Sequence, residues 1–161
     1  MVLKKIINYG LHHIDNFDLK NFKKVMNSNF LTQGPLVEKF EKNLNNHFKS
    51  KYSVVLSNGT AALHLAIKAL RLKENSTILT TPLTFISTAS SIIMNNHKPL
   101  FVDIEKDTLT LDVNKVEDEL KKNSKIRAII GVDFGGHPCN WQDLFYLKNK
   151  YNLKLINDNC H

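Results

Sequence analysis

The sequence is short of the residues on which several classes of protein depend. Its 161 residues contain only two cysteines, Cys139 and Cys160, and four prolines. The cysteines do not form a CxxC pair and are too few for a disulfide framework, which excludes a small disulfide-stapled domain. Together with His137 and His161 they match no standard spacing of zinc ligands, so we expect no metal site.

Long hydrophobic runs are also missing. No stretch approaches the ~18 apolar residues of a membrane-spanning helix. Residues 1–17 contain lysines but lack the apolar segment of a secretory signal peptide. We therefore expect a cytoplasmic protein without a membrane partner.

The charge is positive but not concentrated. The net charge is +7, from 22 Lys and Arg against 15 Asp and Glu. The basic residues are scattered, and no basic stripe is interleaved with aromatic residues, so we expect no nucleic-acid partner. An anionic small molecule is compatible with this charge.

The remaining composition is that of an ordinary soluble domain, with 42% hydrophobic and 23% charged residues. From Tyr52 onward, short apolar runs alternate with helical segments, a pattern typical of βαβ units. We predict an α/β fold with a mainly parallel sheet covered by helices. Strands are expected at 53–56, 77–80, 98–102, 128–132 and 154–157. Helices are expected at 15–27, 36–48, 60–71, 84–95, 112–123 and 141–151.

The stretch 54–70, VVLSNGTAALHLAIKAL, combines a short apolar strand, a turn and a helix N-terminus. The first turn of a helix has free backbone amides and a positive dipole end, which attract anions. Gly59 leaves room for an anion near the backbone, and Thr60 adds a hydroxyl donor. These residues favour a phosphate site, but a helix cap without a ligand fits them equally well.

Ligands of parallel sheets bind at the carboxyl ends of the strands. A dinucleotide site of the Rossmann type is not expected there, because no GxGxxG follows the first strand. Acidic side chains at these ends, such as Asp103 and Asp133, are compatible with either ligand binding or simple turn capping. The segments expected at this edge are 57–60, 81–85, 103, 133–137 and 158–161.

Five segments, in order along the chain, resemble the DegT/StrS-type sugar aminotransferases. The resemblance implies the first part of the large domain of a fold-type I enzyme that depends on pyridoxal 5′-phosphate (PLP). The segment 132–139, VDFGGHPC, is similar to the transaminases that make UDP-4-amino-4,6-dideoxy-N-acetyl-β-L-altrosamine, a pseudaminic acid precursor. The five segments are 30–35 (FLTQGP), 57–63 (SNGTAAL), 81–85 (TPLTF), 101–104 (FVDI) and 158–161 (DNCH).

The resemblance assigns cofactor-binding roles to particular residues. Gly59, Thr60 and Ala61 correspond to the segment that holds the cofactor phosphate. Phe85 corresponds to the aromatic residue that stacks on the pyridine ring, for which a flat apolar face is suited. Asp158 corresponds to the carboxylate that keeps the pyridine nitrogen protonated, which makes the ring an electron sink.

Three further positions receive roles from the same resemblance. His161 corresponds to the residue beside the phenolic oxygen of the cofactor. Thr32 and Gln33 correspond to a loop near the substrate mouth and are expected to bind substrate.

The implied reaction moves an amino group from an amino acid, usually L-glutamate, to the 4-keto group of a nucleotide-linked sugar, in the synthesis of bacterial surface polysaccharides. In the family the Schiff-base lysine lies downstream of the Asp158 position, past the last residue here. We therefore assign no catalytic residue and expect the 161-residue chain alone to be inactive.

The resemblance also predicts the organisation of the chain and its assembly. An N-terminal arm and helix are expected over 1–29, and an incomplete PLP-binding large domain over 30–161. Full-length members of the family are homodimers. The alternative is a non-catalytic module that binds PLP or a nucleotide sugar.

Overall fold

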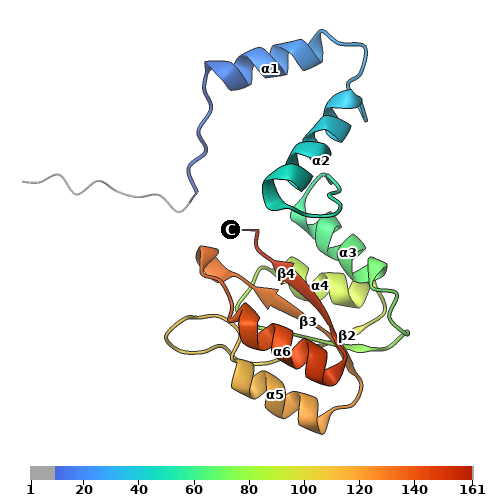
Figure 1. The fold of residues 1–161 in the computed structure, drawn as a ribbon, viewed down its shortest axis with the longest axis vertical. Coiled ribbons are helices and arrows are strands. Elements are labelled where there is room, and N and C mark those ends of the chain that lie inside the picture. Colours follow the sequence, from blue (N-terminus) through green and yellow to red (C-terminus); the bar gives the residue numbers. More distant parts are fainter. Residues whose placement is uncertain (1–9, 161) are drawn as a thin grey trace, which may run out of the picture. The chain divides into compact units, whose positions relative to one another are not determined.

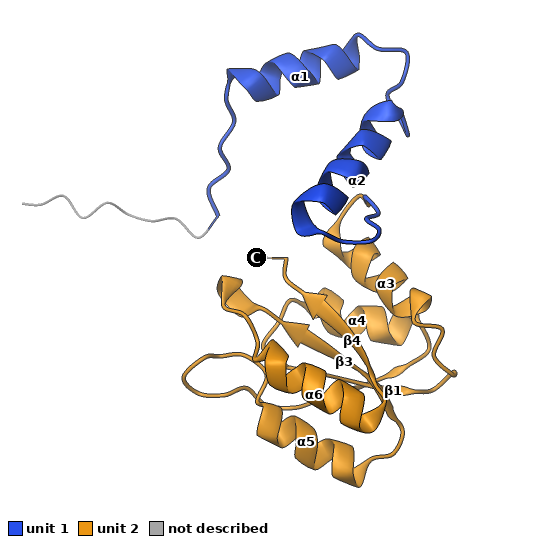
Figure 2. Cartoon of the chain, in the orientation of Figure 1, with its two compact units in different colours: residues 1–55 blue, residues 56–161 orange. Residues whose placement is uncertain are grey.

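A computed structural model describes residues 10–160 of the protein, so His161 lies outside the described residues. The chain divides into two compact units, residues 1–55 and residues 56–161 (Figure 2). Each unit is described by itself.

The first unit contains two amphipathic helices, α1 (Asn16–Met26) and α2 (Pro35–Phe48). The side chain of Asp15 caps α1, and Asp18 returns the bond to the backbone of Asp15, which forms a capping box. Pro35 occupies the first turn of α2, where a missing amide costs nothing. None of the residues in these two helices is buried.

The second unit is an alternating α/β domain built on a four-stranded parallel sheet (Figure 1). The strand order is β2-β1-β3-β4, and all four carboxyl ends therefore lie at one edge. The elements are α3 (Gly59–Ala69), β1 (Thr77–Thr80), α4 (Ile86–Met94), β2 (Lys98–Phe101), α5 (Val113–Lys122), β3 (Ile126–Val132), a 3-10 turn (Phe134–Gly136), α6 (Trp141–Tyr151) and β4 (Lys154–Asp158).

The core of this unit lies in two layers because neighbouring residues of a strand face opposite sides of the sheet. Ile78 and Ile130 pack with Ile67 of α3 and Ile92 of α4 on one face. The opposite face forms a second cluster with α5 and α6 (Figure 1). Its buried members include Leu79, Val116, Leu120, Ile129, Leu144 and Leu147. The expectation of a parallel sheet covered by helices is confirmed.

The expected strand at 53–56 is wrong. Residues 52–56 belong to none of the strands found in the part of the chain that the structure describes. Val54 is 72% exposed, and the amide of Val55 donates to Glu41 Oε1 at 2.9 Å. An apolar run becomes a strand only when a neighbouring strand takes its backbone hydrogen bonds, and here a side chain of α2 takes one of them.

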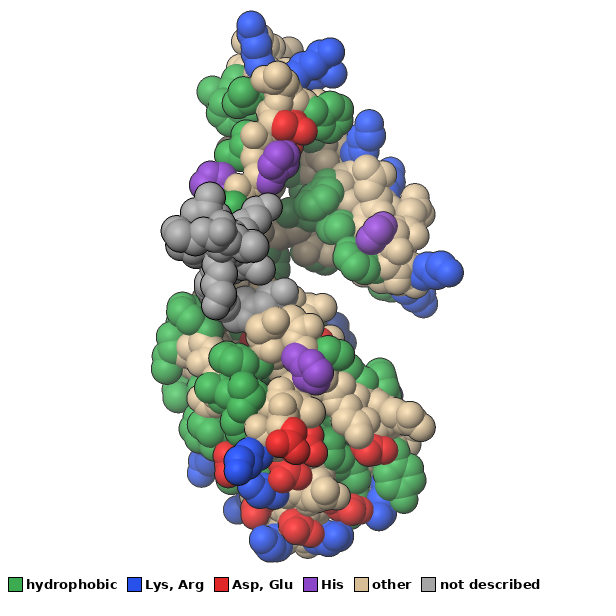
Figure 3. Space-filling model, turned by 90° about the vertical axis from the view of Figure 1, so that its left-hand side faces the viewer, with side chains coloured by type: hydrophobic (Ala, Val, Ile, Leu, Met, Phe, Trp, Pro, Cys, Tyr) green, Lys and Arg blue, Asp and Glu red, His purple; other side chains and the backbone are tan. Residues whose placement is uncertain are grey.

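Charged side chains of α5 and α6 form exposed pairs of mixed sign. Lys121 Nζ lies 3.2 Å from Asp118 Oδ1, and Lys150 Nζ lies 2.7 Å from Glu117 Oε1. Figure 3 shows blue and red side chains interspersed at the lower end of the molecule. The positive charge of the chain is therefore partly neutralised on this surface. Among residues 10–160, no helix combines the length and the hydrophobicity needed to span a bilayer.

Candidate functional site

The buried carboxylate of Asp158 is the centre of the candidate site. Asp158 is the last residue of β4, and it is 7% exposed. The Thr88 hydroxyl donates to Asp158 Oδ2 at 2.7 Å, and the Cys160 thiol donates to Asp158 Oδ1 at 3.0 Å. The Asp133 amide donates to the Asp158 carbonyl at 3.0 Å, which fixes the backbone beside β3. Each carboxylate oxygen thus receives one donor, and the remaining lone pairs stay available.

The N-terminus of α4 supplies the second part of the site. Phe85 is the N-cap residue of α4, and its ring is 70% exposed. Thr84 Oγ1 lies 2.7 Å from Thr88 Oγ1. Because the single hydroxyl proton of Thr88 goes to Asp158, Thr84 is the donor in this pair. A large exposed aromatic ring thus begins the helix whose first turn is bonded to the buried carboxylate.

The N-terminus of α3 supplies the third part. Asn58 caps the helix, and its Oδ1 accepts from the Ala61 amide at 2.9 Å. No acceptor among the described residues takes the amides of Gly59 and Thr60. A Cβ added at Gly59 would lie 3.2 Å from Cys160 Sγ, so this helix end and the end of β4 are in contact. The structure therefore shows a capped helix that keeps two free donors beside Asp158.

The thiol of Cys160 is a donor in this arrangement. Its hydrogen bond to Asp158, followed by partial burial, raises the pKa of Cys160 to about 11. The sulfur therefore keeps its proton at neutral pH and can donate to a carboxylate oxygen. Burial likewise raises the pKa of Cys139 to about 11. Within residues 10–160, no three His, Cys, Asp or Glu side chains gather in a geometry that could hold a metal ion.

The carboxylate of Asp133 at the end of β3 is used in holding a loop. Asp133 Oδ1 accepts from the Cys139 amide at 2.9 Å and from Trp141 Nε1 at 3.0 Å. The Trp141 ring packs over Gly131, where an added Cβ would lie 2.8 Å from the ring. Asp133 thus fixes the connection from β3 to α6.

The carboxylate of Asp103, which follows β2, is held by a salt bridge. Asp103 Oδ2 lies 3.1 Å from Lys115 Nζ, and Oδ1 accepts from the Ile104 amide at 2.9 Å. The hydrogen bond from Lys115 is the largest of the effects that lower the pKa of the Asp103 carboxyl. Asp103 therefore serves the turn after β2.

The two expected substrate residues lie in the other unit. Thr32 and Gln33 are exposed in the loop between α1 and α2. Gln33 has a φ of 48°, in the left-handed region. It lines a cavity of about 160 Å³ whose other walls include Phe30 and Val37. Their role in binding substrate stays a prediction, as does that of His161.

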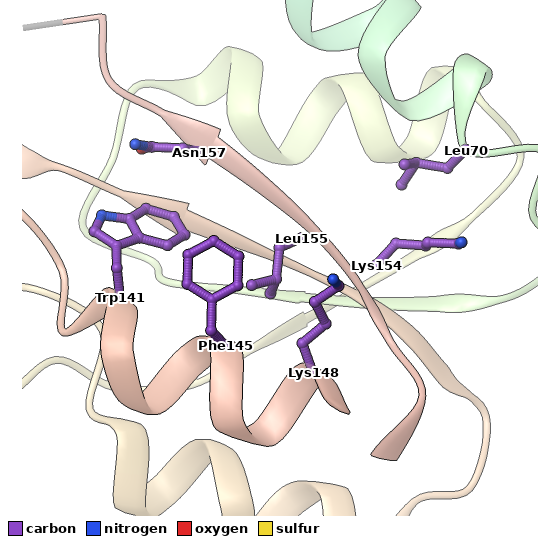
Figure 4. A pocket seen from close by; sticks show the side chains of 7 residues that line it. All are labelled: Leu70, Trp141, Phe145, Lys148, Lys154, Leu155 and Asn157. Atoms are coloured by element: carbon purple, nitrogen blue, oxygen red, sulfur yellow. The ribbon is translucent and has the colours of Figure 1, made fainter. Parts of the chain in front are cut away.

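A larger cavity, of about 500 Å³, is lined mainly by residues of α6 and β4. Figure 4 shows Trp141, Phe145 and Lys148 of α6 facing Leu155 and Asn157 of β4. None of the residues assigned to the cofactor lines this cavity. Its size alone does not make it part of the candidate site.

The sequence alone does not identify Thr88 and Cys160 as partners of Asp158. The expected helix at 84–95 puts Thr84 and Thr88 on one face, because residues four apart share a face of a helix. In the structure α4 begins at Ile86, so Thr84 lies in the turn before the helix. Nothing in the local sequence says that Thr88 meets a strand end 70 residues away. The position of Cys160 two residues after Asp158 was visible, but its contact with Gly59 depends on the fold.

Comparison with known proteins gives a consistent result. Residues 12–161 match the DegT/DnrJ/EryC1/StrS aminotransferase family. The chain is 40% identical over 157 residues to a UDP-4-amino-4,6-dideoxy-N-acetyl-beta-L-altrosamine transaminase of Campylobacter jejuni, covering 97% of this chain and 41% of that protein. It spans about two fifths of the length of the curated relatives it matches.

Solved structures agree with this match. The aminotransferase PseC of Helicobacter pylori, involved in the biosynthesis of pseudoaminic acid, superposes with a TM-score of 0.90 and 27% identity, over 98% of this chain and 42% of that one. NtdA of Bacillus subtilis with bound cofactor PMP superposes with a TM-score of 0.83 and 27% identity, over 88% and 32% of the two chains. The neighbours are fold-type I aminotransferases, which confirms the expected fold class.

Proposed function

Because the chain belongs to the DegT/DnrJ/EryC1/StrS aminotransferase family, we propose that it forms the cofactor-binding part of a PLP-dependent enzyme that aminates a nucleotide-linked sugar. The amino donor is an amino acid, with L-glutamate the first candidate, and the acceptor is a 4-keto sugar. The product serves the synthesis of surface polysaccharides or sugars of the pseudaminic acid type. The functions of the Campylobacter and Helicobacter relatives support this substrate class.

The single observation that carries the proposal is the meeting of three segments at the carboxyl edge of the sheet. Asp158 is bonded to Thr88 of α4, and Cys160 touches Gly59 of α3. A pyridine ring with a phosphate group needs a carboxylate for its nitrogen, a flat face for its ring and donors for its phosphate. The edge offers all three types of group.

The residues present fit PLP by their chemistry. The free amides of Gly59 and Thr60 at the N-terminus of α3 suit a phosphate dianion. The Ala61 amide already donates to Asn58, so Gly59 and Thr60 carry the larger share of this role. The exposed ring of Phe85 suits stacking on a pyridine. Bound PLP supplies an electron sink for the carbon that carries the amino group.

The part that this chain plays in the chemistry follows from the same atoms. Asp158 would accept a hydrogen bond from the protonated ring nitrogen and so favour its charged form. The N-terminus of α3 and the Thr60 hydroxyl would hold the phosphate. The exposed side chain of Phe85 would offer a flat apolar face to the pyridine ring. Thr32 and Gln33 are the residues of this chain proposed to contact the sugar substrate.

We expect a homodimer, as in the full-length family. The observation in support is that α1 and α2 carry large apolar side chains without burying any residue. Phe17, Phe22 and Phe40 are 71%, 65% and 52% exposed. An amphipathic helix is stable when its apolar face is covered, and a second copy supplies such a cover. Sedimentation equilibrium tests this, and a monomer at micromolar concentration would contradict it.

The proposed function has a test in two parts. The 161-residue chain is dialysed against PLP, and we expect binding that Asp158→Ala weakens strongly. Isotopically labelled glutamate and a nucleotide-linked 4-keto sugar are then incubated with the chain itself and with any longer product of its gene, and amino transfer is followed by mass spectrometry.

The outcomes separate an enzyme from a binding module. We expect no transfer by the 161-residue chain, because the lysine position of the family follows residue 161. We expect transfer by a longer product that carries this lysine. Binding of PLP without transfer by such a product would point to a non-catalytic module, and no binding at all would remove the proposal.

A further inference from the structure

The bond between Thr88 and Asp158 joins a helix to the end of a strand across the site. Thr88 is fully buried in the first turn of α4, and its hydroxyl donates to Asp158 Oδ2 at 2.7 Å. Its own amide donates to the Phe85 carbonyl at 3.1 Å, so the turn that bears Thr88 also bears Phe85. Thr88 thus ties the carboxylate of the site to the element that presents the aromatic ring.

The hydrogen bonds that join Thr84, Thr88 and Asp158 all donate toward the carboxylate. An ionised carboxylate only accepts, so Thr88 gives its single proton to Asp158. The oxygen of Thr88 then accepts from Thr84 Oγ1, which lies 2.7 Å away in the turn that precedes α4. A hydroxyl that accepts one hydrogen bond becomes a better donor in the next, because the two bonds polarise one another. The series of hydrogen bonds from Thr84 through Thr88 therefore ends on the carboxylate of Asp158.

The two donors to Asp158 differ in strength. Thr88 offers a short O–H···O bond, whereas Cys160 offers a thiol, which is a weak donor. The backbone of Asp158 is fixed by the Asp133 amide, which leaves the side-chain torsions to be set by these donors. Thr88 is consequently the stronger restraint on the plane of the carboxylate.

We propose that Thr88, supported by Thr84, is a positioning residue that aims the Asp158 carboxylate at the ring nitrogen of the cofactor. The role rests on the proposed function, since a pyridine nitrogen must be the partner of Asp158. Without this role, the Thr88 hydroxyl would be only a buried polar group whose hydrogen bonds are satisfied. It also makes the orientation of Asp158 depend on α4 rather than on β4 alone.

The test measures binding of pyridoxamine 5′-phosphate (PMP), which needs no lysine, by equilibrium dialysis. Thr88→Val keeps the shape of the side chain and removes its hydroxyl. We expect PMP affinity to fall about tenfold, because a carboxylate that is no longer held in orientation makes a weaker hydrogen bond to the ring N–H. Thr88→Ser restores the hydroxyl and should restore most of the affinity.

Thr80→Val is the matched control. Thr80 is also fully buried, and its hydroxyl donates to the Ile130 carbonyl at 3.1 Å. Both valine variants should lower the free energy of unfolding by similar amounts, and only Thr88→Val should weaken PMP binding. Equal losses of affinity in the two variants would overturn the positioning role, since they would reflect general destabilisation.

A spectroscopic readout reports the orientation directly. With nitrogen-labelled PMP, the chemical shift of the bound ring nitrogen follows its protonation as pH is raised. A misaimed carboxylate stabilises the N–H less, so the pKa of the ring nitrogen should be lower in Thr88→Val than in the wild type. An unchanged titration in Thr88→Val would overturn the inference.

The remaining outcomes are also decisive. If Thr88→Val does not fold, Thr84→Val replaces it, because Thr84 is only partly buried and acts through Thr88. A fall in affinity of about threefold supports the relay, and no change overturns it. If the wild type binds no PMP, the proposed function fails and the role of Thr88 fails with it. If Asp158→Asn weakens binding while Thr88→Val does not, the proposed function stands and the inference alone is overturned.

Discussion

Substitution of Asn58 separates the two roles that the N-terminus of α3 can play, as a capped helix end and as a phosphate site. Asn58 Oδ1 accepts from the Ala61 amide at 2.9 Å, while the amides of Gly59 and Thr60 stay free. Asn58→Ala removes the cap. Asn58→Asp keeps an acceptor in place and adds a negative charge. The first variant tests the helix, and the second tests the ligand.

The expected magnitudes follow from this geometry. Loss of an N-cap acceptor costs about 1 kcal/mol of unfolding free energy, or about 4–8 °C in Tm for a domain of roughly 100 residues. Asn58→Asp should keep this stability, or gain about 0.5 kcal/mol from the helix dipole. A carboxylate beside a phosphate dianion should repel it by about 1–3 kcal/mol, which is about ten- to a hundredfold in affinity.

The assay pairs urea denaturation, followed by circular dichroism, with dialysis against PMP. Asn140→Ala is the control, because Asn140 Oδ1 caps α6 by accepting from the Asp143 amide at 3.2 Å. It should cost about as much stability as Asn58→Ala and leave PMP binding unchanged.

Two results would refute the reasoning. Wild-type stability of Asn58→Ala would mean that the cap contributes nothing. Wild-type PMP affinity of Asn58→Asp would mean that the phosphate does not bind at α3, however well the helix is capped.

Three further predictions follow from the same structure. Phe85→Ala should change unfolding free energy by less than about 0.5 kcal/mol, because the ring is 70% exposed. It should nevertheless weaken PMP binding about three- to tenfold in dialysis, and equal binding would remove the stacking role. Leu144→Ala should cost about 2–5 kcal/mol in urea denaturation, since Leu144 is fully buried, whereas the half-exposed Leu65→Ala should cost under about 1 kcal/mol. The pKa of Cys160, raised from 9.0 to about 11, means that the folded chain holds the thiol proton more firmly than the unfolded chain. Its contribution to stability should be complete below pH 9.0 and lost as pH rises through about 11, and iodoacetamide should label Cys160 slowly at neutral pH. Labelling as fast as that of a free thiol would contradict the bond to Asp158.

The alternation of apolar runs and helical segments was enough to predict the parallel sheet. Both faces of the sheet are covered, so all four residues of β1 and six of the seven residues of β3 are buried, and α5 shows its buried face at helical spacing. The run at 53–56 has the same local appearance. It is not a strand because pairing depends on a neighbour, and local sequence does not contain that information.

The sequence predicts that the candidate site lies at the ends of the strands, but it does not predict which hydrogen bonds join the residues there. By position alone, Asp103 and Asp133 are as good candidates as Asp158, since each follows a strand. Their carboxylates instead hold Lys115 and Trp141, which only the folded loops bring near. Thr88, by contrast, gives no signal in the sequence, because a threonine inside a helix looks like an ordinary buried side chain. What distinguishes these residues is which partner the tertiary structure brings to each of them.

The order of the strands explains why the site depends on the whole second unit. β4 pairs with β3, β3 pairs with β1, and α4 follows β1, so Asp158 reaches Thr88 only when all three strands are aligned. The contact between Cys160 and Gly59 adds α3 to the same alignment. An unfolded chain holds these groups far apart and has no site to offer. A ligand of this edge therefore binds the folded state alone, and its binding free energy adds to the stability of the sheet that assembles the site.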